Sequence, residues 1–300
     1  DLTAHSFQWN YWLLALAFCG FVLQELSFGV IWKTVLKRLG YDLSFRHSLR
    51  IYLASEFVRY LPGNVWHILT RILWAGEYGI PRPVAFASMT VELITKLASG
   101  VLIFGLSLLF WEDMGAIGKL LPGPVIIGLG IITIVSLLVV LHPKVLNGLL
   151  NKGLKILKRD PVVLTLRYVD ILVVTVAWSI SWIVAGIAFY VLLLSIYPAT
   201  PLIALPICIG IYAIGWDIGF VSFITPSGLG FRELAIGALF ALSLPLPAAL
   251  GGVIALLSRV VSTVAELLCV SIAYLSGGRK VPQEQKEQTE EETVGGYVRD

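Results

Sequence analysis

Residues 171–196 read ILVVTVAWSISWIVAGIAFYVLLLSI, a run without a single Asp, Glu, Lys, Arg or His. A helix rises about 1.5 Å per residue, so about 20 apolar residues cross the hydrocarbon core of a bilayer. This stretch is therefore long enough to span a membrane as one helix.

Five more apolar stretches have a similar character. They are Trp12–Ile31, Val84–Phe110, Val125–Leu141, Leu202–Ile224 and Ala248–Leu275. Of the 300 residues, 57% are hydrophobic and 14% are charged, whereas about 25% of the residues of a soluble domain are charged. The sequence therefore predicts an all-α polytopic protein of the cell membrane, with residues 1–275 as its transmembrane domain.

The composition argues against several other classes of protein. Lys and Arg form no continuous basic face, which excludes nucleic acid as an expected partner. The four His residues form no HxxxH or HExxH pair, and Cys19, Cys208 and Cys269 lie in apolar runs without ligand spacing. We therefore expect no metal site and no cofactor, and we expect the three cysteines to belong to the core.

Two further segments are interrupted by proline and glycine. Leu49–Trp74 is broken at Pro62-Gly63-Asn64, and Thr225–Leu244 begins with TPSGLG. If each segment is a re-entrant hairpin that returns to the side it left, 17 of the 22 Lys and Arg residues lie on one side of the membrane and one lies on the other. Because cytoplasmic loops carry an excess of Lys and Arg, this bias predicts two re-entrant hairpins and a cytoplasmic C-terminus.

The same arrangement predicts an inverted repeat. Residues 10–110 and 170–275 each contain a spanning helix, a broken hairpin and a second spanning helix. The single linking helix 125–141 turns the second half upside down. One hairpin would then open toward the inside of the cell and the other toward the outside.

Two segments are predicted to lie outside the membrane core. Residues 145–159 place leucines on one helix face and basic residues on the other, which is typical of a helix in the cytoplasmic interface. A basic loop is the alternative for these residues. The tail 276–300 is rich in Glu and Gln and has almost nothing to bury, so we expect it to be disordered.

Several ionisable residues fall inside the predicted spans. An ionised group at the bilayer centre costs at least about 2.5–3.5 kcal/mol, so it is usually paired or faces a polar cavity. Glu92 and Lys96 are spaced i,i+4 on one helix face, and Arg259 and Glu266 lie two turns apart. Each pair either neutralises itself and joins helices, or lines a site. Glu25, near the end of its span, is expected to snorkel or to cap the helix.

The broken segments predict where a site would lie. A helix that begins after Pro62-Gly63 or after Ser227-Gly228 points free N–H groups into the protein, and such termini bind phosphates and carboxylates. Corresponding Gly/Pro-interrupted segments are typical of transporter sites, although two kinked helices packed for stability are an alternative. The candidate substrate-binding residues are Arg59, Gly63, Asn64, His67, Arg71, Glu92, Lys96, Ser227, Gly228, Arg232, Glu233 and Arg259.

Three motifs occur in a recognisable order along the chain. They are RYLPGNVWH at 59–67 followed by Arg71, ASMTVE at 87–92, and PSGLGFRE at 226–233. In this order they resemble the lysylphosphatidylglycerol synthase transmembrane-region family, which is also described as flippase-like. The resemblance covers nearly all of residues 10–275, and it implies an integral membrane protein that handles a lipid or a lipid-linked headgroup. Family members commonly begin with one more helix, so a helix before Asp1 is expected.

The resemblance implies the lipid class only in part. In the best-known members this region moves aminoacylated phosphatidylglycerol between leaflets, beside a synthase domain that this sequence does not contain. Stand-alone members often accompany glycosyltransferases, which implies polyprenyl-phosphate sugars or glycolipids. The stretch Asn64-Val65-Trp66-His67 replaces a more glycine-rich one in many members.

The leading hypothesis is a flippase-like transporter that moves an anionic phospholipid, a glycolipid or a polyprenyl-phosphate-linked sugar between leaflets by alternating access. Arg59, Arg71 and Arg232 would hold the phosphate, while Glu92 and Glu233 would pair with these arginines or bind a cationic headgroup. Two alternatives stay open: an integral membrane transferase acting on a lipid phosphate, and a non-transporting partner subunit of a glycosyltransferase. The oligomeric state, including a homo-oligomer, is open as well.

Overall fold

The computed structural model describes residues 9–60, 66–111, 123–156, 166–222, 225, 228–244 and 246–275. Within these residues every regular element is a helix, which confirms the all-α class. The elements are α1 (Tyr11–Arg38), α2 (Phe45–Glu56), η2 (Phe57–Tyr60), α3 (Trp66–Gly76), α4 (Arg82–Ser107), η3 (Leu108–Phe110), α6 (Gly123–Val140), α7 (Pro143–Ile156), α8 (Tyr168–Ile196), α9 (Ala204–Val221), α10 (Phe231–Ser243) and α11 (Ala248–Leu275).

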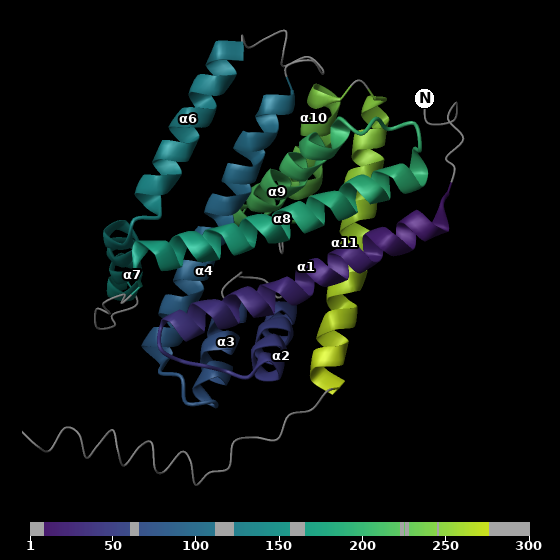
Figure 1. Ribbon diagram of the computed structural model, residues 1–300. Helices are drawn as coiled ribbons and strands as arrows, with labels where there is room; N and C mark the ends of the chain where they lie inside the picture. The colour runs from purple at the N-terminus through teal and green to yellow at the C-terminus, as the bar shows by residue number, and fades with distance from the viewer. Residues whose placement is uncertain are drawn as a thin grey trace, which may run out of the picture.

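The two long helices α1 and α8 pack along each other through the middle of the molecule (Figure 1). Asn10 caps the start of α1, because its side-chain oxygen accepts hydrogen bonds from the backbone N–H groups of Trp12 and Leu13 at 3.1 and 3.2 Å. At its other end α1 continues past the predicted span to Arg38. Glu25 therefore lies in the middle of the helix and is buried, so the prediction that it snorkels or caps was wrong.

The helices form two groups of four that interlock. In the first group α1 packs on α2 and α4, and α3 packs on both α2 and α4. In the second group α8 packs on α9 and α11, and α10 packs on both α9 and α11. Between the groups, α1 contacts α8 and α11, α4 contacts α8 and α9, and α2 contacts α11.

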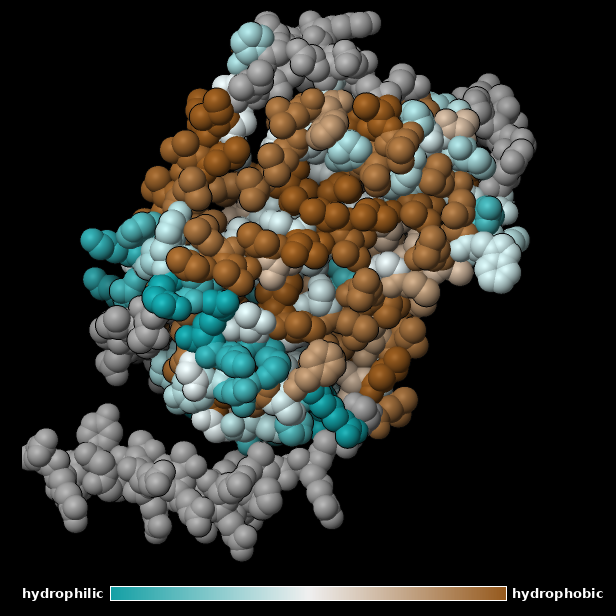
Figure 2. Space-filling view, in the orientation of Figure 1, coloured by the Kyte–Doolittle hydropathy of each residue, from teal (hydrophilic) through white to brown (hydrophobic). Residues whose placement is uncertain are grey.

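In the part of the chain that the structure describes, five helical segments are long and apolar enough to cross a membrane: α1, α4 with η3, α8, α9 and α11. Large hydrophobic side chains cover much of the surface over α6, α8 and the neighbouring helices, whereas hydrophilic side chains gather toward the end that carries α2, α3 and α7 (Figure 2). A helix that is apolar on all sides is stable only inside a protein or in lipid. These features define a multi-pass membrane protein.

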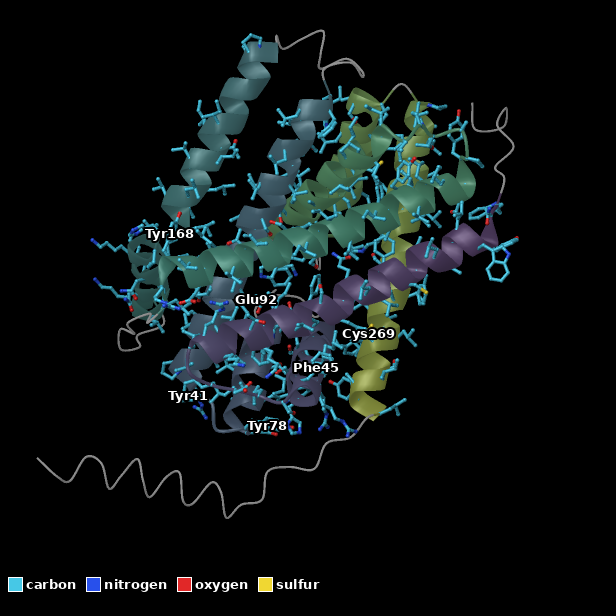
Figure 3. All side chains as sticks on the ribbon, in the orientation of Figure 1. Tyr41, Phe45, Tyr78, Glu92, Tyr168 and Cys269 are labelled. Atoms are coloured by element: carbon cyan, nitrogen blue, oxygen red, sulfur yellow. The ribbon has the colours of Figure 1, made fainter. Side chains whose placement is uncertain are left out.

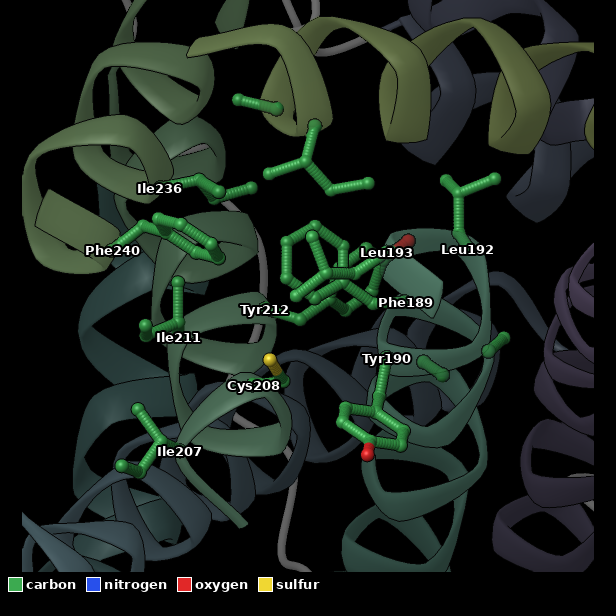
Figure 4. Packing of buried hydrophobic residues seen from close by; sticks show 14 of the residues in the cluster. Phe189, Tyr190, Leu192, Leu193, Ile207, Cys208, Ile211, Tyr212, Ile236 and Phe240 are labelled. Atoms are coloured by element: carbon green, nitrogen blue, oxygen red, sulfur yellow. The ribbon is translucent and has the colours of Figure 1, made fainter. Parts of the chain in front are cut away.

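Small residues allow the helices of the second group to approach closely. A Cβ atom at Gly186 of α8 would lie 2.4 Å from the Cα atom of Ile209 on α9, so only glycine fits there. Small residues at helix interfaces are a general means of packing in membranes. Beside this contact, the rings of Phe189 and Tyr212 have centroids 5.5 Å apart (Figure 4).

The cysteines divide between the core and the surface. Cys208 and Cys269 are buried, whereas Cys19 is exposed on α1. The prediction of three core cysteines was therefore wrong for Cys19, because an apolar position on a spanning helix faces lipid as readily as it faces the protein.

Helices α6 and α7 lie between the two groups in the chain and bend by 65° where they meet. The α7 helix buries Leu146, Leu150 and Leu154 and exposes Lys144 and Lys152. Residues 143–156 thus form an amphipathic helix. The tail 276–300, predicted to be disordered, lies outside the described residues.

Candidate functional site

Two adjoining cavities lie inside the bundle. The α3 cavity, of about 760 Å³ including its mouth, is lined by Tyr52, Glu56, Arg71, Glu92 and Lys96 together with apolar residues of α3 and α4. The α10 cavity, of about 670 Å³ including its mouth, is lined by Glu25, Gly228, Arg232, Arg259, Ser262 and Glu266 together with residues of α9. His67, Trp216 and Phe220 line both cavities and therefore separate them.

Arg71 of α3 is the centre of a buried ion cluster in the α3 cavity. Its Nη1 donates to Oε2 of Glu92 over 2.8 Å, its Nη2 donates to Oε1 of Glu56, and its Nε donates to Oγ of Ser55 over 3.0 Å. The hydroxyl of Tyr52 donates to the other oxygen of Glu92 over 2.7 Å. Every nitrogen of the guanidinium is thus engaged, and Arg71 joins the first broken segment to α4.

Lys96 lies one helical turn beyond Glu92 on α4, and aromatic rings surround its ammonium. The Nζ atom is 3.8 Å from the ring centroid of Phe28, 4.0 Å from that of Trp216 and 4.8 Å from that of Trp178. Rings at these distances stabilise a desolvated cation through their negative faces. Figure 3 shows Glu92 of the same helix at the middle of the bundle, between α8 and α1 in that view.

Arg232, the second residue of α10, lines the α10 cavity with hydrogen-bond donors that lack an acceptor. Its side chain is 6% exposed, and its Nε and Nη2 atoms have no hydrogen-bond partner among the described residues. The guanidinium lies 4.9 Å from the ring centroid of Tyr212. A buried donor without an acceptor costs about 1–3 kcal/mol, and more when it is charged. The position therefore favours an anion that supplies acceptor oxygens.

Glycine residues bring the start of α10 against α9. Gly228 and Gly230 have φ angles of +67° and +89°, which glycine adopts without the steric cost that a side chain adds. A Cβ atom at Gly219 of α9 would lie 2.8 Å from Cβ of Arg232. The glycines of the motif at 226–233 and of α9 therefore fix the position of Arg232 in the cavity.

Glu233 and Arg259 link the start of α10 to α11. One carboxylate oxygen of Glu233 accepts the N–H of Gly230 over 2.7 Å, and the other lies 3.7 Å from Nη1 of Arg259. Glu233 therefore pairs with Arg259 of α11, whereas the sequence predicted that it pairs with Arg59, Arg71 or Arg232 or binds a cationic headgroup. Glu266, the expected partner of Arg259, lines the same cavity.

Trp216 and Phe220 form the wall between the cavities. They are one helical turn apart on α9, and their rings stack with centroids 5.3 Å apart and planes inclined by 9°. His67, at the start of α3, borders both cavities beside them. Any molecule that passes from one cavity to the other must displace this wall.

The two cavities have matching sets of charges. Arg71 and Lys96 face Glu56 and Glu92 in the α3 cavity. Two arginines and two glutamates likewise line the α10 cavity. The cavities differ in how these arginines are hydrogen-bonded. Glu56, Glu92 and Ser55 together accept a hydrogen bond from each nitrogen of Arg71, whereas Nε and Nη2 of Arg232 have no partner among the described residues.

The structure brings most of the predicted site residues together. His67, Arg71, Glu92, Lys96, Gly228, Arg232, Glu233 and Arg259 line or border the two cavities. Gly63, Asn64 and Ser227 lie outside the described residues, as does the side chain of Arg59, whose backbone belongs to η2.

Other lining residues were not among the candidates. Tyr52, Glu56, Trp216, Glu25 and Glu266 line the cavities as well. The three glutamates were detectable as charges inside apolar segments, whereas an aromatic residue in a spanning helix gives no signal in the sequence. In the part of the chain that the structure describes, no group of three His, Cys, Asp or Glu side chains is placed to hold a metal ion.

The fold and the site define a class: a multi-pass α-helical membrane protein with buried, charged cavities. The family model of the lysylphosphatidylglycerol synthase TM region matches residues 3–269. The chain therefore belongs to this family, as the three motifs predicted. No curated protein and no solved structure matches the chain. Membership of the family is compatible with a lipid-related function in the membrane.

Proposed function

We propose that the protein is a flippase-like transporter that moves a lipid with a phosphate-bearing headgroup between leaflets. The substrate would be an anionic phospholipid, a glycolipid or a polyprenyl-phosphate-linked sugar. The observation that carries the proposal is the buried guanidinium of Arg232, which lines a cavity and has two donor atoms without partners. Phosphate oxygens would satisfy both atoms through charge-assisted hydrogen bonds.

The physical problem that such a protein solves is the cost of moving a charge through hydrocarbon. A single charged side chain at the bilayer centre costs at least about 2.5–3.5 kcal/mol. The cavities offer the headgroup cations, carboxylates and hydroxyls in place of water, while the apolar outer surface leaves the lipid tails in the bilayer. The headgroup would enter one cavity, pass the wall of Trp216 and Phe220, and leave through the other.

The packing of the helices supports an inverted repeat as the basis of alternating access. The helices of the two groups correspond as α1 to α8, α2 to α9, α3 to α10 and α4 to α11. If each helix is replaced by its counterpart, every pair of these eight helices that packs together becomes a pair that also packs together, and the α1–α8 pair becomes itself. The α2–α3 segment would be the first re-entrant hairpin. The second would be the α9–α10 segment, which includes the stretch Leu202–Ile224 that the sequence predicted to be a span. Rocking of one half against the other would then open the cavities alternately to the two sides of the cell membrane, with the C-terminus in the cytoplasm.

The proposal is tested with purified protein in proteoliposomes that contain a labelled anionic phospholipid or a labelled polyprenyl-phosphate sugar in one leaflet. We expect protein-dependent movement of at least one of them, measured as the fraction accessible to an impermeant reagent. Mass spectrometry of the recovered lipid should show an unchanged headgroup, because a changed one would indicate the transferase. Folded protein that moves neither lipid would contradict the proposal and favour a role as a partner subunit.

A further inference from the structure

Asp217 is a buried carboxylate that the proposed lipid path does not use. It follows Trp216 on α9, is 5% exposed, and packs against α4. A Cβ atom at Gly100 of α4 would lie 2.2 Å from Oδ2 of Asp217, so the carboxylate occupies space that any side chain on Gly100 would fill. Neither oxygen of Asp217 has a hydrogen-bond partner among the described residues.

The charged surroundings of Asp217 come from α4. Lys96 lies one turn before Gly100, on the face of α4 against which Asp217 packs. Helix α8 carries no ionisable residue between Trp178 and Phe189, the stretch that packs at this level. The charges of α10, Arg232 and Glu233, lie on the other side of α9, where Gly215 and Gly219 contact α10.

This geometry suits a group that alternates between two protonation states. Burying an ionised carboxylate without hydrogen bonds has a high free-energy cost. The cost falls when the carboxylate binds a proton and becomes a neutral acid, or when a cation lies beside it. Asp217 can lower this cost in both ways, because it can take up a proton or attract Lys96. Glu92, Lys96 and Gly100 follow each other at intervals of four residues on one face of α4, so Lys96 lies between Glu92 and Asp217 along that face.

We propose that Asp217 is a proton-binding site that couples a proton gradient to the movement of lipid; this inference rests on the proposed function. The Asp217 carboxylate takes a proton from one side of the membrane to become a carboxylic acid, and releases it to the other side to regenerate the carboxylate. No other bond forms or breaks.

The proton affects the lipid path through two neighbours of Asp217. Uptake of the proton removes the attraction between Asp217 and Lys96, so the ammonium moves toward Glu92. Trp216, whose ring lies 4.0 Å from Nζ of Lys96, forms the wall between the cavities. Protonation therefore changes one contact of Trp216, and in this way it links the charge of Asp217 to passage between the cavities.

The proton site is tested independently of lipid movement by infrared difference spectroscopy of the purified protein across a pH titration. We expect a protonated-carboxyl band that Asp217→Asn lacks and that the control Asp42→Asn, at an exposed loop position paired with Lys33, retains. Should Asp217→Asn melt early, Lys96→Gln serves as the second variant, and the band should then persist to higher pH. A spectrum unchanged in both variants would overturn the proton site.

Coupling is tested in proteoliposomes with an imposed pH gradient. A gradient of one pH unit corresponds to a tenfold equilibrium bias for each proton that is moved. Under such a gradient the wild type should shift the ratio of labelled lipid between the leaflets by up to about tenfold. Asp217→Asn should not shift this ratio. An equal shift in both proteins would overturn the coupling. A proton band without lipid movement by the wild type would instead overturn the proposed function and leave the proton site standing.

Discussion

Nη1 of Arg71 lies 2.8 Å from Oε2 of Glu92, and this contact joins the first broken segment to a spanning helix. Glu56 holds the opposite side of the same guanidinium. Such a cluster is stable only while its charges balance, because each remaining ion would otherwise be buried without a partner. Arg71 therefore acts as the structural centre of the α3 cavity.

Loss of Arg71 should destabilise the protein. Arg71→Met leaves Glu56 and Glu92 without their common partner, and breaking a buried ion pair from one side typically costs about 3–5 kcal/mol. We expect a clearly lower melting temperature in detergent. Adding Glu56→Gln and Glu92→Gln to Arg71→Met should restore most of it. If Arg71→Met melts like the wild type, the cluster does not hold α3 against α4.

The wall between the cavities predicts sided access. In a background with the three native cysteines replaced, Thr90→Cys reports on the α3 cavity and Thr263→Cys on the α10 cavity. Because Trp216 and Phe220 separate the cavities, we expect an impermeant thiol reagent to label each cysteine from a different side of the membrane.

Removing the wall should abolish this difference. Trp216→Ala eliminates one ring of the stack, so both cysteines should then react from both sides. Labelling of both cysteines from one side in the protein with the intact wall would contradict the separation of the cavities.

The sequence predicted which charged residues belong to the site better than it predicted which of them pair with one another. Charged residues in apolar spans are costly enough to stand out, and Arg71, Glu92 and Arg232 were identified in this way. Their partners depend on how helices far apart in the chain cross, which a periodic pattern does not specify. The pairing of Glu233 with Arg259 joins α10 and α11, which approach so closely that a Cβ atom at Gly251 would lie 3.0 Å from the carbonyl oxygen of Gly237.

The same limit applies to the fold. The run 171–196 was sufficient to predict a spanning helix, and the structure contains it within α8. The span that began at Trp12 was predicted too short, because Lys33 and Lys37 ended the apolar run although the helix continues. Glu25 was misread for that reason.

Gly228 should be sensitive to substitution. Its φ of +67° disfavours a side chain, and an added Cβ atom would lie 2.2 Å from the carbonyl oxygen of Gly219. Gly228→Ala should therefore push the start of α10 away from α9, at a cost of about 1–3 kcal/mol, and slow lipid movement by displacing Arg232. Gly252→Ala, where an added Cβ meets nothing within 4 Å, is the matched control. Equal melting temperatures and equal rates for the two variants would show that the start of α10 is not constrained in this way.

The most direct test of the account compares Arg232→Ala with the wild type in the proteoliposome assay. A charge-assisted hydrogen bond contributes about 1.5–3 kcal/mol, so loss of the guanidinium should slow movement of the phosphate-bearing lipid by about ten- to a hundredfold while the protein stays folded. Arg82→Ala, at an exposed position at the start of α4, should move lipid at the wild-type rate. Wild-type movement by folded Arg232→Ala would contradict the assignment of Arg232 as the phosphate site.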